Sequence, residues 1–350
     1  MTTAEPTSIA TVPALMRAAV ARRYGTPGNV VVEQIPVPEA KRTEVLVRVE
    51  ASSLNALDWH FLTGTPYLIR IVGGVVRPRR KVPGADVAGT VVGVGPDVTR
   101  FAPGDRVFGE TPGGGCGEYL TVDETHLGAL PDGVSATDAA ATPVAGLTAL
   151  QALRTHAAVR PGEHVLVNGA AGGVGTYTVQ IAIAIALDAR ATAVCSTDTV
   201  EMVRSLGAER VVDYTGEDFT ELETRFDVMI DNVGNRSADE ILPLLAAKGH
   251  YVAVSGPKEN KWCGPMLHIA RLAWRFRRES QTLHQFTASP DADDMLTLSQ
   301  FLESRPGRAA GTARDRPRRD RRRSRRDRYG SRGRQDHRDS GRESLIPMAA

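Results

Sequence analysis

The sequence predicts an α/β protein in which an all-β domain with many tight turns precedes a doubly wound domain built on a parallel sheet. Up to about Pro131, short β-rich segments alternate with glycine and proline turns, as in a small barrel-like domain. From Asp138 the apolar period becomes helical, and strands then alternate with helices. A glycine-rich turn joins one of these strands to the next helix.

The N-terminal part begins with a polar stretch over residues 1–15, which we expect to be a disordered extension. Three short strand patterns follow, the last with Val45, Val47 and Val49 alternating with other residues. We read residues 51–66 as a segment leading into a turn, and residues 83–95 as a β-rich run punctuated by glycine. This region is therefore predicted to be all-β.

The second part opens with two consecutive helices over residues 138–155, because Pro143 and Gly146 interrupt one helical pattern. The regular alternation that follows implies right-handed crossovers between parallel strands. The expected strands are 164–168, 190–195, 211–213, 227–231 and 250–255, and the expected helices are 176–187, 200–206, 237–247, 267–277 and 291–302.

The glycine-rich turn follows the apolar strand that ends at Asn168, and it has the form A-x-G-x-x-G. A helix N-terminus offers unpaired backbone N–H groups, and residues without bulk let a pyrophosphate approach them. The pattern thus predicts a dinucleotide site, and a plain glycine-rich turn is the alternative. The residues predicted to hold the cofactor here are Ala170, Gly172, Gly173, Val174 and Gly175.

The choice between NADPH and NADH depends on the end of the second strand, where NAD-binding proteins place an acid for the ribose 2′-hydroxyl. Hydroxyl side chains stand there instead, and we expect NADPH, with Ser196, Thr197, Arg204 and Tyr214 around its 2′-phosphate. Asp198 opposes this expectation, because an acid repels a phosphate or accepts from a ribose hydroxyl. NADH therefore stays open.

Composition limits the other function classes. The three cysteines form no C-x-x-C pair, which indicates neither a disulfide framework nor a cysteine zinc cluster. No apolar stretch is long enough to cross a bilayer, and the first residues do not resemble a secretory signal. We therefore expect a cytoplasmic protein with no membrane partner.

Seven motifs, in this order and spacing, resemble the zinc-independent medium-chain dehydrogenase/reductase superfamily, in particular its quinone oxidoreductase and enoyl reductase branch. They are residues 53–58, 83–89, 104–109, 115–119, 146–150, 170–175 and 230–234.

This resemblance covers residues 16–304 and implies a GroES-like β-barrel domain over 16–137 and a Rossmann domain over 138–288. A helix at 289–304 would lead back to the barrel. The family pattern also implies that Asn55 and Thr148 lie near the nicotinamide as catalytic residues, and that Asn232 and Val233 contact the cofactor. A turn-capping role for Asn55 is the alternative, because asparagine is common in such turns.

Zinc-dependent relatives carry a histidine where Ala85 stands, and the four-cysteine lobe is missing here. We therefore expect no metal, and we expect NAD(P)H-dependent reduction of quinones or α,β-unsaturated carbonyls, which are small molecules. The alternative is a cofactor-binding relative that is catalytically impaired or structural, and an alcohol dehydrogenase is less favoured. A homodimer is an open expectation, since relatives are commonly dimers.

The tail at 305–350 differs in charge from the rest of the chain. It holds 16 Arg, no Lys and six acids, while residues 1–304 hold 27 basic and 35 acidic side chains. A disordered arm that binds nucleic acid or anionic surfaces is one interpretation.

We favour a reading-frame slip near Arg305 as the origin of this tail, and we therefore do not expect nucleic acid to be a partner. Codons for a family-like ending, Glu-Ile-Gly-Thr-Gly-His, when shifted by one base, can encode residues 326–332.

Overall fold

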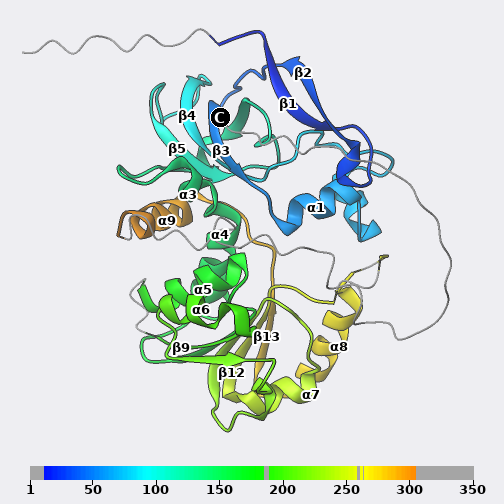
Figure 1. Ribbon diagram of the computed structural model, residues 1–350, viewed down its shortest axis with the longest axis vertical. Helices are drawn as coiled ribbons and strands as arrows, with labels where there is room; N and C mark the ends of the chain where they lie inside the picture. Colours follow the sequence, from blue (N-terminus) through cyan, green and yellow to red (C-terminus); the bar gives the residue numbers. More distant parts are fainter. Residues whose placement is uncertain (1–11, 185–188, 258–260, 263, 305–350) are drawn as a thin grey trace, which may run out of the picture. The chain divides into compact units, whose positions relative to one another are not determined.

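Antiparallel strands form the first part of the chain (Figure 1). The computed structural model describes residues 12–184, 189–257, 261–262 and 264–304. Strands β1 (Leu15–Ala21) and β2 (Val30–Pro36) pair with each other. A five-stranded sheet has the order β6-β3-β4-β5-β7, with bounds β3 (Glu44–Ser53), β4 (Asp86–Val94), β5 (Arg106–Glu110), β6 (Tyr119–Asp123) and β7 (Leu127–Ala129).

The alternation predicted for β3 places Val45 and Val47 in a core of the five-stranded sheet, with Val49 partly buried against it. Successive side chains of a strand point to opposite faces, so one face can be apolar. The prediction of an all-β region is wrong in one place, because helices α1 (Ala56–Thr63) and α2 (Arg70–Gly73) follow β3. Asn55 stands at the N-cap of α1 and Gly64 ends it in the left-handed conformation, which are signals that we read as a turn.

Helices α3 (Ala136–Ala140) and α4 (Pro143–Gln151) confirm the two consecutive helices. Pro143 is tolerated at the first turn of α4, where its missing N–H has no helical partner to lose. A π-helical turn continues α4 over Ala152–His156.

Six strands form the predicted parallel sheet, in the order β10-β9-β8-β11-β12-β13. This order, with two halves growing outward from β8, is that of a doubly wound sheet. The strands are β8 (His164–Asn168), β9 (Arg190–Cys195), β10 (Arg210–Asp213), β11 (Phe226–Asp231), β12 (Leu245–Ala253) and β13 (Thr282–Gln285), and the helices are α5 (Gly173–Ala184), α6 (Val200–Ser205), α7 (Ala238–Ile241), α8 (Met266–Phe276) and α9 (Ala292–Ser304).

One predicted helix is largely wrong. Residues 237–247 form only the single turn α7 and a 3₁₀ turn over Leu242–Leu244, and β12 already begins at Leu245. Pro243 cannot donate a helical hydrogen bond, and Leu245 pairs with Phe226 at the edge of β11. Strand β13 was not predicted, and α5 begins at Gly173, three residues before the expected start.

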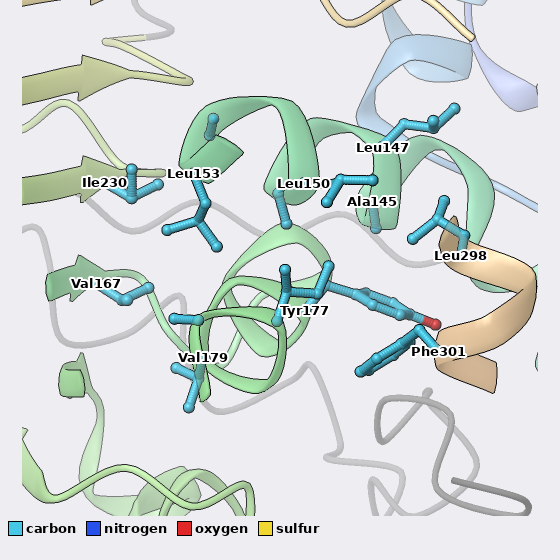
Figure 2. Close-up of a cluster of buried hydrophobic side chains, with 14 of the residues drawn as sticks. Ala145, Leu147, Leu150, Leu153, Val167, Tyr177, Val179, Ile230, Leu298 and Phe301 are labelled. Carbon is cyan, nitrogen blue, oxygen red and sulfur yellow. The ribbon is translucent and has the colours of Figure 1, made fainter. Parts of the chain in front are cut away.

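The largest core lies where α4 packs on α5 and α9, and Figure 2 shows its side chains. Leu150 of α4 is buried and points toward Tyr177 of α5, whose ring lies 6.2 Å from that of Phe301. Helix α9 also packs against β7 of the antiparallel sheet. Helix α9 therefore contacts both α4 and the antiparallel sheet.

Some expectations fall outside the described residues. They are the Arg-rich tail at 305–350, most of the N-terminal extension and the end of the helix after the glycine turn. Among the described helices, none is long and apolar enough to cross a bilayer.

We expect Gly175→Ala to lower the free energy of unfolding by about 2 kcal/mol, because overpacking a tight site forces the backbone to move. A Cβ at Gly175 would lie 2.2 Å from the carbonyl oxygen of Gly169. Gly216→Ala is the matched control, since its Cβ would meet nothing within 4 Å. Urea unfolding of both variants measures the difference, and equal stability would contradict this close approach.

Candidate functional site

The turn between β8 and α5 uses its glycines in two ways. Gly169 has a φ of +75°, which favours glycine, and Gly175 is buried against Gly169 and Ala170. Gly172 and Gly173 are exposed instead, and a Cβ at Gly173 would meet only Ala145, at 3.8 Å. The turn thus packs against the protein at Gly175, whereas Gly172 and Gly173 face the solvent.

The N-terminus of α5 has the geometry of an anion site. The backbone N–H of Thr176 donates to the carbonyl of Gly172 as the first bond of the helix. Within the described residues, no backbone acceptor meets the N–H groups of Gly173, Val174 and Gly175. Unpaired N–H groups at the positive end of a helix dipole bind phosphate groups, so this turn fits a dinucleotide pyrophosphate. Ala170 is fully buried beside it.

A buried carboxylate organises the neighbouring strand ends. Asp231, at the end of β11, accepts hydrogen bonds from the Asn168 side chain (2.9 Å), the Tyr251 hydroxyl (2.7 Å) and the backbone N–H of Val233 (2.9 Å). Burial raises the pKa of Tyr251, and the Asp231 charge adds to this. These bonds fix the loop after β11 beside the glycine turn.

Asn232 and Val233 lie on the loop after β11, and both contact residues at the start of the glycine turn. The Asn232 backbone N–H and side-chain Nδ2 donate to the carbonyl of Asn168, at 3.1 and 3.0 Å. A Cβ at Gly169 would lie 2.8 Å from the Val233 side chain. The Asn232 Oδ1 atom is buried and has no hydrogen-bond partner among the described residues.

The residues predicted for the 2′-phosphate are only partly brought together. Thr197 donates to the Asp213 carboxylate (2.6 Å), and the Tyr214 backbone N–H donates to the carbonyl of Cys195 (3.1 Å), next to Ser196. Arg204, on α6, pairs with Glu201, and within the described part of the chain no hydrogen bond or ion pair joins it to Ser196 or Thr197. Asp213 therefore adds an acid beside Thr197 that the sequence reading did not consider.

Asp86 is the second buried carboxylate that organises the site. It begins β4, is fully buried, and accepts from the Asn55 Nδ2 atom at 2.9 Å and the Ser53 hydroxyl at 2.8 Å. Its other oxygen accepts from the backbone N–H of Val144 at 2.9 Å. One side chain thus connects the loop after β3 to the first turn of α4.

Thr148 is linked to the same carboxylate through one turn of helix, because its hydroxyl donates to the carbonyl of Val144 at 2.6 Å. Ala145, between them, lies beside Gly173 of the glycine turn. Asn55, Thr148 and the glycine turn are therefore connected through Asp86 and the start of α4. Asn55 does occupy the N-cap of α1, where its backbone N–H donates to Asp58 at 2.8 Å, so the capping alternative is also met.

Two carboxyl groups, those of Asp86 and Glu110, lie close together in this part of the antiparallel sheet. Burial raises the pKa of Asp86 to about 6, although its hydrogen bonds to Asn55 and Val144 oppose the rise. Burial and the Asp86 charge raise the pKa of Glu110 to about 7. Glu110 pairs with Asp86 across β4 and β5, and its Oε2 atom is buried without a hydrogen-bond partner among the described residues. Arg80 is the neighbouring cation.

A catalytic zinc ion needs three protein ligands. Ala85, where zinc-dependent relatives have histidine, offers no donor atom. In the described ranges, no group of three or more His, Cys, Asp or Glu side chains is placed to hold a metal ion. The described residues therefore provide no three-ligand site for such an ion.

Sequence reasoning missed Asp86 and Asp231 as the groups that organise the site. Each is an acid next to an apolar strand run, in Asp86-Val87-Ala88 and in Met229-Ile230-Asp231. Acids are rarely buried unless they are paired, so an acid inside a buried strand pattern was the available signal.

Known proteins resemble the chain in both sequence and structure. The alcohol dehydrogenase GroES-like domain family matches residues 41–132, and the zinc-binding dehydrogenase family matches residues 173–292. A chloroplastic quinone-oxidoreductase of Triphysaria versicolor is 35% identical over 243 residues, covering 64% of this chain and 70% of that protein.

A second relative and a solved structure also resemble the chain. A chloroplastic NADPH-dependent alkenal/one oxidoreductase of Arabidopsis thaliana is 34% identical over 261 residues, covering 71% of this chain and 65% of that protein. The structure of the quinone oxidoreductase from Coxiella burnetii has a TM-score of 0.70 at 26% identity, covering 83% of this chain and 88% of that one.

The raised pKa of Glu110 predicts that its contribution to stability falls as the pH rises. Its pKa is about 7 in the folded protein against an ordinary 4.5, so the folded state binds more protons in this window. The contribution of Glu110 to the free energy of unfolding is therefore greatest below pH 4.5 and decreases as the pH rises to 7. Glu110→Gln removes this loss, and we expect it to be more stable than the parent by about 2 kcal/mol at pH 8 and equal to it at pH 4.

Urea unfolding from pH 4 to 8 measures this effect, with the exposed Glu223→Gln as the matched control. A difference between Glu110→Gln and the parent that does not change with pH would contradict the buried, unpaired state of this carboxyl group.

Proposed function

Because the chain belongs to the quinone oxidoreductase and enoyl reductase branch of the medium-chain dehydrogenase/reductase superfamily, we propose that it reduces quinones or α,β-unsaturated carbonyls with NADPH and without a metal ion. The observation that carries this proposal is the connection of Asn55 and Thr148 to the glycine turn through Asp86 and α4. When bound, the reduced nicotinamide supplies the hydride.

The N–H groups of Gly173, Val174 and Gly175 would hold the pyrophosphate, and the open side of Gly172 would admit it. Asn232 and Val233, fixed by Asp231 and Asn168, would border the cofactor beside the turn. In this arrangement α4 leads from the pyrophosphate toward the nicotinamide end.

Asn55 has the donor that the reaction needs. Its side-chain amide has two N–H bonds, and one donates to Asp86. The second can donate to the substrate oxygen that gains charge during hydride transfer, and the buried carboxylate holds the amide in this orientation. Thr148 donates its proton to Val144, so its oxygen lone pairs are left to accept from the cofactor.

NADPH is proposed over NADH because hydroxyl side chains, and no acid, directly follow β9. Asp213 and Asp198 lower the expected preference, since both are acids in or next to this region. The homodimer and the cytoplasmic location stay predictions.

Oxidation of NADPH, followed by its absorbance, tests this function with a panel of quinones and enones. We expect turnover that a metal chelator leaves unchanged, with kcat/KM at least tenfold higher for NADPH than for NADH. Asn55→Ala should lower kcat by about a hundredfold, because an oxyanion donor is lost. The control is Gln34→Ala, which removes an exposed amide far from α4 in sequence.

Tight NADPH binding without turnover on the whole panel would instead identify a cofactor-binding protein without this activity. Inhibition by the chelator would contradict the metal-free reaction.

A further inference from the structure

Two segments of the chain expose apolar side chains that no core uses. In residues 67–81, which include α2, the side chains of Ile71, Val72, Val75 and Val76 are 66% to 87% exposed. Isolated exposed apolar residues are ordinary, but four within six positions are not. This segment therefore carries an apolar surface that needs an explanation.

The second segment is residues 261–278, which include α8. The inner side of α8 buries Ile269, Leu272 and Phe276, the last two in the core of the parallel sheet. Its outer side exposes Leu267 (51%) and Trp274 (67%). These residues are seven positions apart, about two helical turns, and therefore lie on the same side of α8. One side of α8 thus packs against the parallel sheet, and the other side exposes apolar residues to the solvent.

The two segments meet. The backbone N–H groups of Tyr67 and Leu68 donate to the carbonyls of Lys261 and Trp262, at 2.8 and 3.1 Å. The Tyr67 ring packs edge-on against the Trp262 ring with centroids 5.2 Å apart. We call the exposed residues of 67–81, 261–262 and 264–278 together the cationic apolar face.

Positive charge accompanies the apolar residues on this face. Each segment carries five Lys or Arg residues and no Asp or Glu, although residues 1–304 as a whole have more acids than bases. In the described part of the chain, no ion pair joins the exposed Arg77, Arg271, Arg277 or Arg278 to an acid. Bases and apolar side chains are therefore both available to a partner.

We propose that the cationic apolar face binds the surface of anionic lipid bilayers. A helix with an arginine-rich side and exposed tryptophan and leucine lies in the membrane interface, where apolar side chains enter the acyl boundary and arginines meet lipid phosphates. Tryptophan favours this region because its ring is both apolar and polar. A nucleic acid would use the arginines but leave the aliphatic side chains Ile71, Val72, Val75 and Val76 in water.

The proposal does not rest on the proposed reductase activity, because it needs neither cofactor nor substrate. Its test uses the full chain with phosphatidylcholine vesicles, with or without phosphatidylglycerol as one lipid in three. Trp262 (75% exposed) and Trp274 (67%) belong to the face, and Trp59 (52%) lies outside it on α1. We expect binding to the anionic vesicles only, with a blue shift of tryptophan emission and quenching by brominated acyl chains.

Paired variants locate the contact. The double variant Arg277→Glu, Arg278→Glu should lower the vesicle partition coefficient at least tenfold. The double variant Leu267→Ser, Trp274→Ser should also lower it at least tenfold, and should reduce the blue shift of tryptophan emission. The matched controls are Arg160→Glu with Arg225→Glu, and Leu296→Ser, all exposed outside the face. They should change the partition less than twofold, and unchanged unfolding temperatures show that the variants fold.

Three results would overturn the proposal. Face variants that bind like the parent would place the contact elsewhere, for example in residues 305–350. Binding without a tryptophan shift would exclude insertion of the face. Concentration-dependent dimerisation that the face variants abolish, without vesicle binding, would identify a second copy of the chain as the occupant.

Discussion

The buried carboxylate of Asp86 is the interaction on which the candidate site depends. It receives hydrogen bonds from Ser53, Asn55 and the backbone of Val144, and thereby joins the end of β3 to the start of α4. Hydrogen bonds to a charged acceptor are stronger than neutral ones, and each donor would be left unsatisfied without it. Burial of Asp86 raises its pKa to about 6, which favours the neutral acid. The hydrogen bond from Asn55 opposes this rise, so the bond that positions Asn55 also favours the charged carboxylate.

Local signals were enough to predict the parallel sheet and the glycine turn, because a strand, a turn and a helix N-terminus each have a sequence pattern. The packing of the turn against the protein depends on Gly175, whose missing Cβ the A-x-G-x-x-G pattern already requires. The role of Asp86 could not be predicted in the same way, since its partners lie 31 to 58 positions away. The helix expected at 237–247 failed for a related reason, because pairing of Leu245 with β11 overrides local helical preference.

The expectation of no membrane partner shows a second limit of sequence patterns. The absence of a long apolar stretch argues against a spanning helix, and the described helices agree with it. It does not address contact with a membrane surface, which depends on side chains such as Ile71 and Trp274 being exposed together. That exposure becomes visible only when the buried side of α8 is known.

If the residues connected by Asp86 direct a hydride from the nicotinamide to a conjugated substrate, a label on the transferred hydrogen must reach the product. Reduction of an enone with NADPH deuterated at C4 of the nicotinamide, followed by mass spectrometry and NMR of the product, measures this transfer. We expect one deuterium on the β-carbon of the product when the transferred face is labelled, and none when the opposite face is labelled. A product that carries no deuterium from either labelled cofactor would contradict hydride transfer from the nicotinamide.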